Sequence, residues 1–448
     1  MDIKNKKISI IGAVKSGIGA AKMIKNLGGI PFVSDSGSKE KLFDSIETLV
    51  SNQIEFEIGK HSERVFDCDF IVISPGVPSN SFIIQNAINK KIKIISEIEL
   101  ASYFCKGKII AITGTNGKTT TTSLTGHILK TCGFNTYVAG NIGNAFSEIA
   151  LDVKPDEIVV LEVSSFQLDF IESFKPYIAM ILNITPDHLN RYDNKYKNYI
   201  DAKLRIYMNQ SNDDYLIINK DSESLINSLD RSNVKKFYFS LHENQTNGAY
   251  LTGESINFIL NSELQFSCSL TDIKLNGEHN YANSMAAIIS AKILGGNNDK
   301  IKEALSSFAG VEHRMELVRE LEGVKYINDS KATNIDSVWY ALRSYEYPIF
   351  LILGGLDKGN DYNQIKDLVL EKVKKIYAIG ASSEKIFNFF HGIVKVEIVK
   401  SLEDAVSEAN REARQNEIVL LSPACASFDM FNSYEHRGKV FKEIVNNL

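Results

Sequence analysis

Short, continuous apolar runs alternate with amphipathic stretches along almost the whole chain. The runs are Ile8–Ile11, Pro31–Val33, Phe70–Ile73, Ile109–Ile112, Ile158–Val163, Ile178–Leu182, Phe350–Leu353, Ile376–Ile379 and Ile418–Leu421. Strands that are apolar on both faces are typical of parallel sheets covered by helices on both sides. The pattern therefore predicts an α/β fold.

Breaks in this pattern divide the chain into three blocks. Residues 1–99 form strand–helix repeats with their own glycine-rich first turn, residues 100–309 begin a new series at Lys108, and residues 310–448 begin again after Gly310. Inside the middle block, Ala249–Leu275 alternates polar and apolar residues, which predicts a small antiparallel patch. Because 448 residues are too many for one core, we expect three domains with these boundaries.

Composition narrows the class of protein further. The chain is 44% hydrophobic and 23% charged, with a net charge of −5, which favours a globular protein without a general attraction to nucleic acid or anionic membranes. No apolar run approaches the roughly 18 residues that a membrane helix needs. The five cysteines show no zinc-binding spacing. We expect reduced thiols, a cytoplasmic location, no nucleic-acid partner and no membrane insertion.

A glycine-containing turn follows the buried run Ile109–Ile112 and precedes a helical stretch that reaches Lys130. Glycines let backbone N–H groups face a phosphate, and in such a loop Lys118 can reach the terminal phosphates and the Thr119 hydroxyl can bind Mg²⁺. The strict pattern of such loops has glycine where Ile112 stands, so an ordinary turn with a chance Gly-Lys-Thr is the alternative. The predicted ATP-binding residues are Gly114, Thr115, Asn116, Gly117, Lys118, Thr119 and Thr120.

Two later segments supply candidate metal ligands. Glu162 interrupts an apolar strand near its end, where open α/β sheets bind ligands, and Mg²⁺ would offset its buried charge. A glutamate at a solvent-facing strand end is the alternative. His188 follows another buried strand, and Lys203 lies on a predicted helix. Spacing alone does not distinguish these two residues from a structural histidine and a solvated lysine.

Together these segments resemble the Mur ligase family. Thr113–Thr119 is similar to the family's ATP loop and Asp187–Leu189 to its metal segment, and the resemblance spans the whole chain. It implies an N-terminal Rossmann-like domain for a UDP-sugar, a central ATPase and a C-terminal Rossmann-like domain for an amino acid. It also implies that a substrate carboxylate attacks the γ-phosphate of ATP, that an amine attacks the resulting acyl phosphate, and that two Mg²⁺ ions offset the phosphate charge.

The resemblance assigns roles residue by residue in the middle block. Lys118 and Thr119 would hold ATP and the first metal, and Glu162 and His188 would bind the second. Lys203 matches a lysine that the family carries as a CO₂-derived carbamate, which places a carboxylate beside Mg²⁺. Three further residues match the family's ATP contacts: Asn280 and Asn283 on the adenine side, and Arg314 near the γ-phosphate.

The C-terminal block is similar to the D-glutamate-adding branch of the family. Asp329 would hold the ATP ribose and Lys331 the transferred phosphate. The D-glutamate contacts would be Thr333, Lys358, Ser427 and Tyr434. Cations and hydroxyls are the groups that a site for two carboxylates needs.

The first turn, Gly12–Gly19, with Asp35 at the end of the next strand, resembles a dinucleotide fingerprint, but its glycine spacing does not fit that pattern. The family uses this region for the uridine diphosphate. The expected contacts with that substrate are Lys15, Ser16, Asp35, Ser36, Gly76 and Asn141. Ordinary turn chemistry is the alternative at each of these positions.

The leading hypothesis is therefore an ATP-dependent amide ligase that joins D-glutamate to UDP-N-acetylmuramoyl-L-alanine as a monomer. A ligase of the same family that adds another amino acid is the main alternative. A P-loop nucleotide switch would leave Lys331, Lys358 and Ser427 unexplained. An NAD-dependent oxidoreductase would leave the phosphate loop unexplained.

Overall fold

A computed structural model describes residues 1–229, 233–346, 348–357 and 359–448. It contains three sheets, and each predicted apolar run forms a strand. The α/β class is confirmed. Continuous burial of these strands, such as the fully buried β4 (Phe70–Ile73) and β9 (Ile178–Ile181), explains why the sequence pattern was clear.

The N-terminal sheet has five parallel strands in the order β3-β2-β1-β4-β5. Its strands are β1 (Lys7–Ile11), β2 (Ile30–Asp35), β3 (Glu55–Ile58), β4 and β5 (Lys93–Ser96). The helices of this region are α1 (Lys15–Asn26), α2 (Phe43–Ser51), α3 (Phe82–Asn89) and α4 (Glu97–Ser102).

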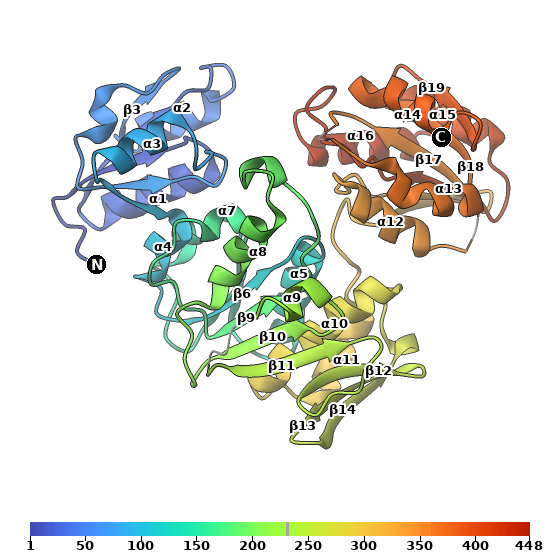
Figure 1. The fold of residues 1–448 in the computed structure, drawn as a ribbon, viewed down its shortest axis with the longest axis horizontal. Helices are drawn as coiled ribbons and strands as arrows, with labels where there is room; N and C mark the ends of the chain where they lie inside the picture. Colours follow the sequence, from blue (N-terminus) through green and yellow to red (C-terminus); the bar gives the residue numbers. More distant parts are fainter. Residues whose placement is uncertain (230–232, 347, 358) are drawn as a thin grey trace. The chain divides into compact units, whose positions relative to one another are not determined.

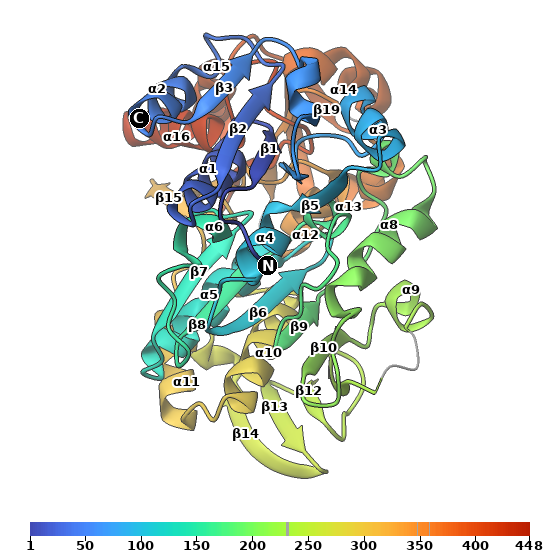
Figure 2. The ribbon, with the colours of Figure 1, turned by 90° about the vertical axis from the view of Figure 1, so that its left-hand side faces the viewer.

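The central sheet has nine strands in the order β14-β13-β12-β11-β10-β9-β6-β8-β7, and Figure 2 shows β7, β8 and β6 side by side. Its other strands are β6 (Lys108–Thr113), β7 (Thr136–Gly140), β8 (Ile158–Glu162), β10 (Tyr215–Asn219), β11 (Lys235–Ser240), β12 (Gly248–Thr252), β13 (Ser255–Leu260) and β14 (Glu263–Ser269). The helices are α5 (Lys118–Thr131), α6 (Phe146–Ile149), α7 (Ser165–Leu168), α8 (Tyr196–Leu204), α9 (Glu223–Ile226), α10 (Glu278–Ile293) and α11 (Asn298–Ser307). The strands β12, β13 and β14 pair antiparallel at one edge (Figure 1), which confirms the predicted patch.

The C-terminal sheet has six strands in the order β15-β16-β20-β17-β18-β19, and only β15 is antiparallel to its neighbour. The strands are β15 (Glu316–Leu321), β16 (Val324–Asn328), β17 (Ile349–Gly354), β18 (Val373–Ile379), β19 (Lys395–Ile398) and β20 (Ile418–Leu421). The helices are α12 (Ile335–Arg343), α13 (Lys366–Lys372), α14 (Ser383–Phe390), α15 (Leu402–Glu412) and α16 (Tyr434–Asn446). Short 3-10 helices elsewhere in the chain cover Glu63–Phe66, Leu189–Arg191, Arg205–Tyr207, Leu270–Asp272, Tyr362–Ile365 and Gly380–Ser382.

The chain separates into two compact units. The first contains Met1–Lys274 and Tyr281–Phe308, and the second contains Leu275–Asn280 and Ala309–Leu448. Apolar residues of the first two sheets share one core, which explains why both sheets belong to the first unit. The boundaries at residues 99 and 309 stay predictions.

All five cysteines lie within the described ranges, and each is a free thiol. Among the described residues, no helix combines the length and apolar composition needed to cross a bilayer.

Candidate functional site

The predicted phosphate loop is a tight turn between a buried strand and a helix. β6 ends at Thr113 and α5 begins at Lys118. Gly117 has φ +81°, in the left-handed region that favours glycine, and a Cβ atom there would lie 2.5 Å from Oδ1 of Asn283. No side chain caps the start of α5, so its first N–H groups are suited to an anion.

A second segment holds this turn in place. The side-chain amide of Asn183, just beyond β9, pairs with the backbone of Asn116: Oδ1 accepts from the N–H at 2.8 Å, and Nδ2 donates to the carbonyl at 3.1 Å. The Thr115 N–H donates to the Asn183 carbonyl at 3.0 Å, and the Thr115 hydroxyl donates to the Thr185 carbonyl, also at 3.0 Å. No functional role was predicted for Asn183, because no local motif marks it.

Two lysines converge on the same turn. Nζ of Lys118 donates to the carbonyls of Gly114 and Thr115 at 2.9 and 2.8 Å. Nζ of Lys203, from α8, donates to the Gly114 carbonyl at 2.8 Å, and its side chain is fully buried. Burial and the nearby Lys118 charge hold the pKa of Lys203 well below its usual range. The alternative interpretation of Lys203 as a solvated surface lysine is therefore wrong.

Glu162 lies beside this turn because β8 pairs with β6, with Glu162 opposite Ile112. The side chain is buried. Its Oε1 accepts from Nδ2 of Asn141 at 2.8 Å, whereas Oε2 has no hydrogen-bond partner in the described part of the chain. An unsatisfied, buried carboxylate oxygen is costly. A divalent cation that prefers oxygen ligands would offset this cost, so the residue fits a Mg²⁺ site.

The other candidate metal ligands lie nearby. Glu162 and Asp187 both act electrostatically on Lys203. Thr119 is the second residue of α5. His188 has φ +53°, its N–H donates to Oδ1 of Asp187 at 2.8 Å, and its ring packs edge-on against Phe166. Thr119 and Lys203 thus lie at the phosphate loop, and His188 is next to Asp187, whose charge acts on Lys203.

The expected UDP-substrate residues meet in one pocket of about 860 Å³ in the first unit. Lys15, Ser16, Asp35, Ser36, Gly76 and Asn141 all line it. Asp35 also fixes local structure, because its carboxylate accepts the N–H groups of Ala13 and Gly37, each at 2.7 Å. Several other residues that line the pocket were not predicted from the sequence, including His61, Phe66 and the largely exposed Phe82.

Asp329 lies at the centre of the second unit's candidate site. Its Oδ2 accepts from the Ser422 hydroxyl at 2.9 Å, and its Oδ1 lies 3.8 Å from Nη1 of Arg314. Complete burial raises the pKa of this carboxyl to about 6, although Arg314 opposes the shift. Nζ of Lys331 donates to the Tyr434 hydroxyl at 3.3 Å. The second unit therefore brings together the expected ATP contacts Arg314, Asp329 and Lys331 with Tyr434.

The remaining predicted residues take the following places. Thr333 is half-buried in the loop before α12, and Ser427 is buried in the loop after β20. Asn280, in the second unit, donates to the Asn276 carbonyl, whereas Asn283, in the first unit, accepts from the Thr121 hydroxyl at 3.1 Å. Lys358 lies outside the described residues.

The fold and these residues define a three-domain α/β protein with a phosphate loop in its central domain. Three family models match it: "Mur ligase MurD-like, N-terminal domain" over residues 6–96, "Mur ligase middle domain" over 112–291, and "Mur ligase, glutamate ligase domain" over 313–425. The chain belongs to the Mur ligase family.

Individual relatives match over the full length. A UDP-N-acetylmuramoylalanine--D-glutamate ligase of Christiangramia forsetii is 45% identical, with 99% of this chain and 100% of the relative covered. Proteins of the same name from Chloroherpeton thalassium and Salinibacter ruber are 44% and 41% identical, and each match covers 100% of this chain and 99% of the relative.

Solved structures share the fold at lower identity. The UDP-N-acetylmuramate-alanine ligase MurC of Thermotoga maritima aligns with a TM-score of 0.65 at 19% identity, covering 99% of this chain and 100% of that one. MurF ligase from the same organism, solved in complex with ADP, aligns with a TM-score of 0.60 at 16% identity, covering 93% and 95%.

Proposed function

We propose that this chain joins D-glutamate to UDP-N-acetylmuramoyl-L-alanine through an amide bond, at the expense of ATP, in the synthesis of a peptidoglycan precursor. The observation that carries the proposal is the full-length similarity to ligases named for this reaction, at 41 to 45% identity. We assign the UDP substrate to the pocket, ATP to the phosphate loop, and D-glutamate to residues of the C-terminal domain.

In the first step the terminal carboxylate of the UDP-linked substrate attacks the γ-phosphorus of ATP. A C–O–P anhydride bond forms, and ADP leaves with the electron pair of the broken P–O bond. Lys118 and the start of α5 would stabilise the charge on the phosphates. Arg314 and Lys331 would contact the transferred phosphoryl group from the C-terminal domain, and Asp329 would bind the ribose. Asn280 and Asn283 would contact the adenine side.

In the second step the amine of D-glutamate attacks the acyl carbon. The amide bond forms, inorganic phosphate leaves, and the amine gives up its excess proton. Thr333, Lys358, Ser427 and Tyr434 would pair with the two carboxylates of D-glutamate and orient its amine. Orienting both reactants removes much of the entropic barrier of a bimolecular step.

Thr119, Glu162, His188 and a carbamate on Lys203 would hold two Mg²⁺ ions. The ions would neutralise charge on the crowded phosphates. The free Oε2 atom of Glu162 supports this assignment. The burial of Lys203 against the phosphate loop supports its carbamylation, because addition of CO₂ converts a cation into a long-armed carboxylate next to the metal site.

The UDP group would occupy the pocket of about 860 Å³. Lys15 and Ser16, at the start of α1, would meet the pyrophosphate, since a helix N-terminus and a lysine both favour phosphate. Asp35, Ser36 and Gly76 would lie nearer the uridine, and Asn141 would contact the substrate from the central domain.

We further propose that the protein acts as a monomer in the cytoplasm. The free thiols agree with a reducing compartment. Light scattering after size-exclusion chromatography tests the oligomeric state, and a stable dimer would overturn that part of the proposal.

The test is a reaction with one amino acid at a time. The full-length protein is incubated with ATP, Mg²⁺ and UDP-N-acetylmuramoyl-L-alanine, and D-glutamate, L-glutamate, L-lysine or diaminopimelate is added separately. We expect phosphate release and a product of higher mass only with D-glutamate, and neither with the Lys118→Ala variant. Preference for another amino acid would overturn the proposed substrate, and absence of turnover with all four would overturn the reaction.

A further inference from the structure

Arg437 is a large charged side chain buried in the C-terminal domain, and none of the roles above uses it. It lies in the first turns of α16 and is only 1% exposed. Burial lowers the pKa of its guanidinium to about 10, so the group stays charged at neutral pH. Burying such a charge costs several kcal/mol unless hydrogen bonds compensate for it.

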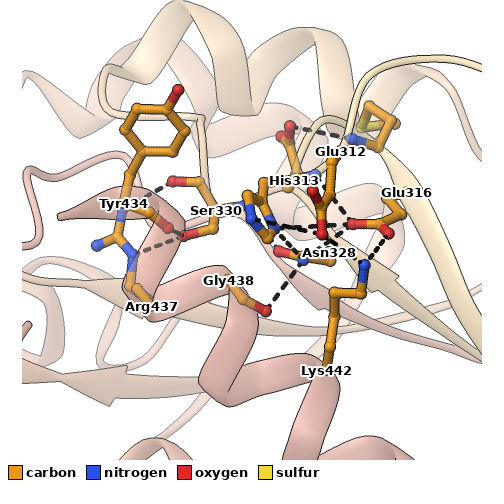
Figure 3. A network of polar contacts seen from close by, with 11 residues as sticks. Glu312, His313, Glu316, Asn328, Ser330, Tyr434, Arg437, Gly438 and Lys442 are labelled. Carbon is orange, nitrogen blue, oxygen red and sulfur yellow. Dashed lines mark hydrogen bonds and ion pairs between the residues drawn. The ribbon is translucent and has the colours of Figure 1, made fainter.

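The compensating bonds reach two separate segments of the chain. Nε donates to the Ser330 hydroxyl at 3.0 Å, and Nη2 donates to the Ser330 carbonyl at 2.8 Å and to the Cys425 carbonyl at 3.1 Å. Figure 3 shows the guanidinium facing Ser330 beside Tyr434. All three acceptors are neutral, so these bonds form no ion pair. The planar guanidinium of Arg437 instead fixes the positions of the two segments that carry the acceptors.

Both segments carry residues of the proposed site. Ser330 stands between Asp329 and Lys331, which we assigned to ATP. Cys425 stands two residues before Ser427, which we assigned to D-glutamate. The Ser330 hydroxyl also donates to the Tyr434 carbonyl at 2.8 Å. One guanidinium therefore connects the segment for the phosphoryl group with the segment for the amino acid.

A neighbouring glycine leaves space for this arrangement. Gly355 has φ +135°, and a Cβ atom there would lie 3.3 Å from Nη1 of Arg437 and 2.4 Å from the carbonyl oxygen of Ala426. A side chain at this position would displace the loop that leads to Ser427 or crowd the guanidinium. Glycine at position 355 therefore leaves room both for the loop that leads to Ser427 and for the guanidinium of Arg437.

We infer that Arg437 is a positioning residue of the ligase, which fixes the separation between Lys331 and Ser427 and so aligns the amine of D-glutamate with the acyl phosphate. The inference rests on the proposed function. It extends that function by naming a group that touches neither reactant yet determines how the two subsites face each other.

A second set of hydrogen bonds also holds α16 in place, so an effect of Arg437 on catalysis can be measured apart from an effect on folding. Nδ2 of Asn328 contacts Nδ1 of His313 at 2.9 Å and donates to the Gly438 carbonyl at 3.2 Å. Lys442 donates to Glu312 and Glu316 from the same helix (Figure 3). These contacts hold α16 against the segment before Ser330 without Arg437, so we expect conservative variants of Arg437 to fold.

The test compares Arg437→Lys with a matched control, Arg319→Lys. Arg319 also donates to backbone carbonyls, those of Val445 and Asn446 at the far end of α16. For Arg437→Lys, assayed below its melting temperature, we expect kcat to fall and the KM for D-glutamate to rise, each about tenfold or more. The KM for the UDP substrate, whose pocket is lined by residues of the first unit, should change less, and the control should keep all three constants.

A rescue experiment distinguishes a positioning role of Arg437 from a contribution to the stability of the fold. In Arg437→Ala, added guanidinium should restore part of kcat, whereas ammonium at the same ionic strength should not. Wild-type kinetic constants in a folded Arg437→Lys protein, or equal restoration by both cations, would overturn the inference. If the wild-type protein itself does not turn over with D-glutamate, the proposed function fails instead, so the two failures are distinguishable.

Discussion

The side chain of Asn183 offers a sharp test of how the phosphate loop is held. Its amide makes two hydrogen bonds with the backbone of Asn116, and Asn183→Ala removes both. Each such bond contributes about 1 kcal/mol net. The loop needs this support to keep its N–H groups facing a phosphate. We therefore expect a loss of about 2 kcal/mol in ATP binding, which is about a 30-fold rise in Kd.

Isothermal titration calorimetry with ATP and Mg²⁺ measures this change. Asn209→Ala is the matched control, because its amide also makes two backbone hydrogen bonds, to the carbonyls of Glu172 and Phe174, in another part of the central domain. The control should lose some stability to urea and keep its ATP affinity. The reasoning is refuted if Asn183→Ala binds ATP as tightly as the wild type does.

Three other substitutions test separate parts of the account. Lys203→Ala should lose most activity and regain part of it with added formate or acetate, whereas full activity without them would exclude the carbamate. Burial raises the pKa of Asp169 from 3.8 to about 6. Ionisation of this buried carboxyl therefore lowers the free energy of unfolding by up to about 3 kcal/mol as the pH rises from about 4 through about 6. Asp169→Asn should remove this pH dependence from urea unfolding, and an unchanged profile would contradict it. Arg191 donates to the carbonyls of residues 75–77 at the substrate pocket, so Arg191→Gln should raise the KM for the UDP substrate about tenfold and leave that for ATP unchanged in steady-state kinetics.

The sequence predicted the strands well because their signal is local. The run Ile109–Ile112 is apolar without interruption, and it forms the buried β6. The phosphate loop was equally visible, since its glycines and Lys118 follow each other directly. The antiparallel patch was found because its residues alternate, as strands with one covered face do.

The contacts that hold the site together have no such local signal. Asn183 and Asn116 lie 67 residues apart, and Arg437 and Ser330 lie 107 apart. No periodicity or motif indicates that such residues meet. Lys203 shows the same limit, because a lysine on a helix has the same sequence pattern whether it is solvated or buried. Only the family resemblance singled it out, and the structure then placed it in the core.

Asp35 illustrates a different difficulty. Its place at the end of a strand fits a ligand contact, and the structure does bring it to the pocket. Both of its carboxylate oxygens also accept backbone N–H groups. Structural and binding roles at one residue share the same sequence signal, so Asp35→Asn is expected to affect both the turn and the pocket.

In the proposed reaction, ATP phosphorylates the carboxylate of the UDP-linked substrate. Heavy oxygen placed in that carboxylate tests the claim directly, because the acyl phosphate passes one of these oxygens to the departing phosphate. After turnover with ATP and D-glutamate, mass spectrometry should find the label in inorganic phosphate and in the new amide carbonyl. Phosphate without label, alongside normal product formation, would contradict the account.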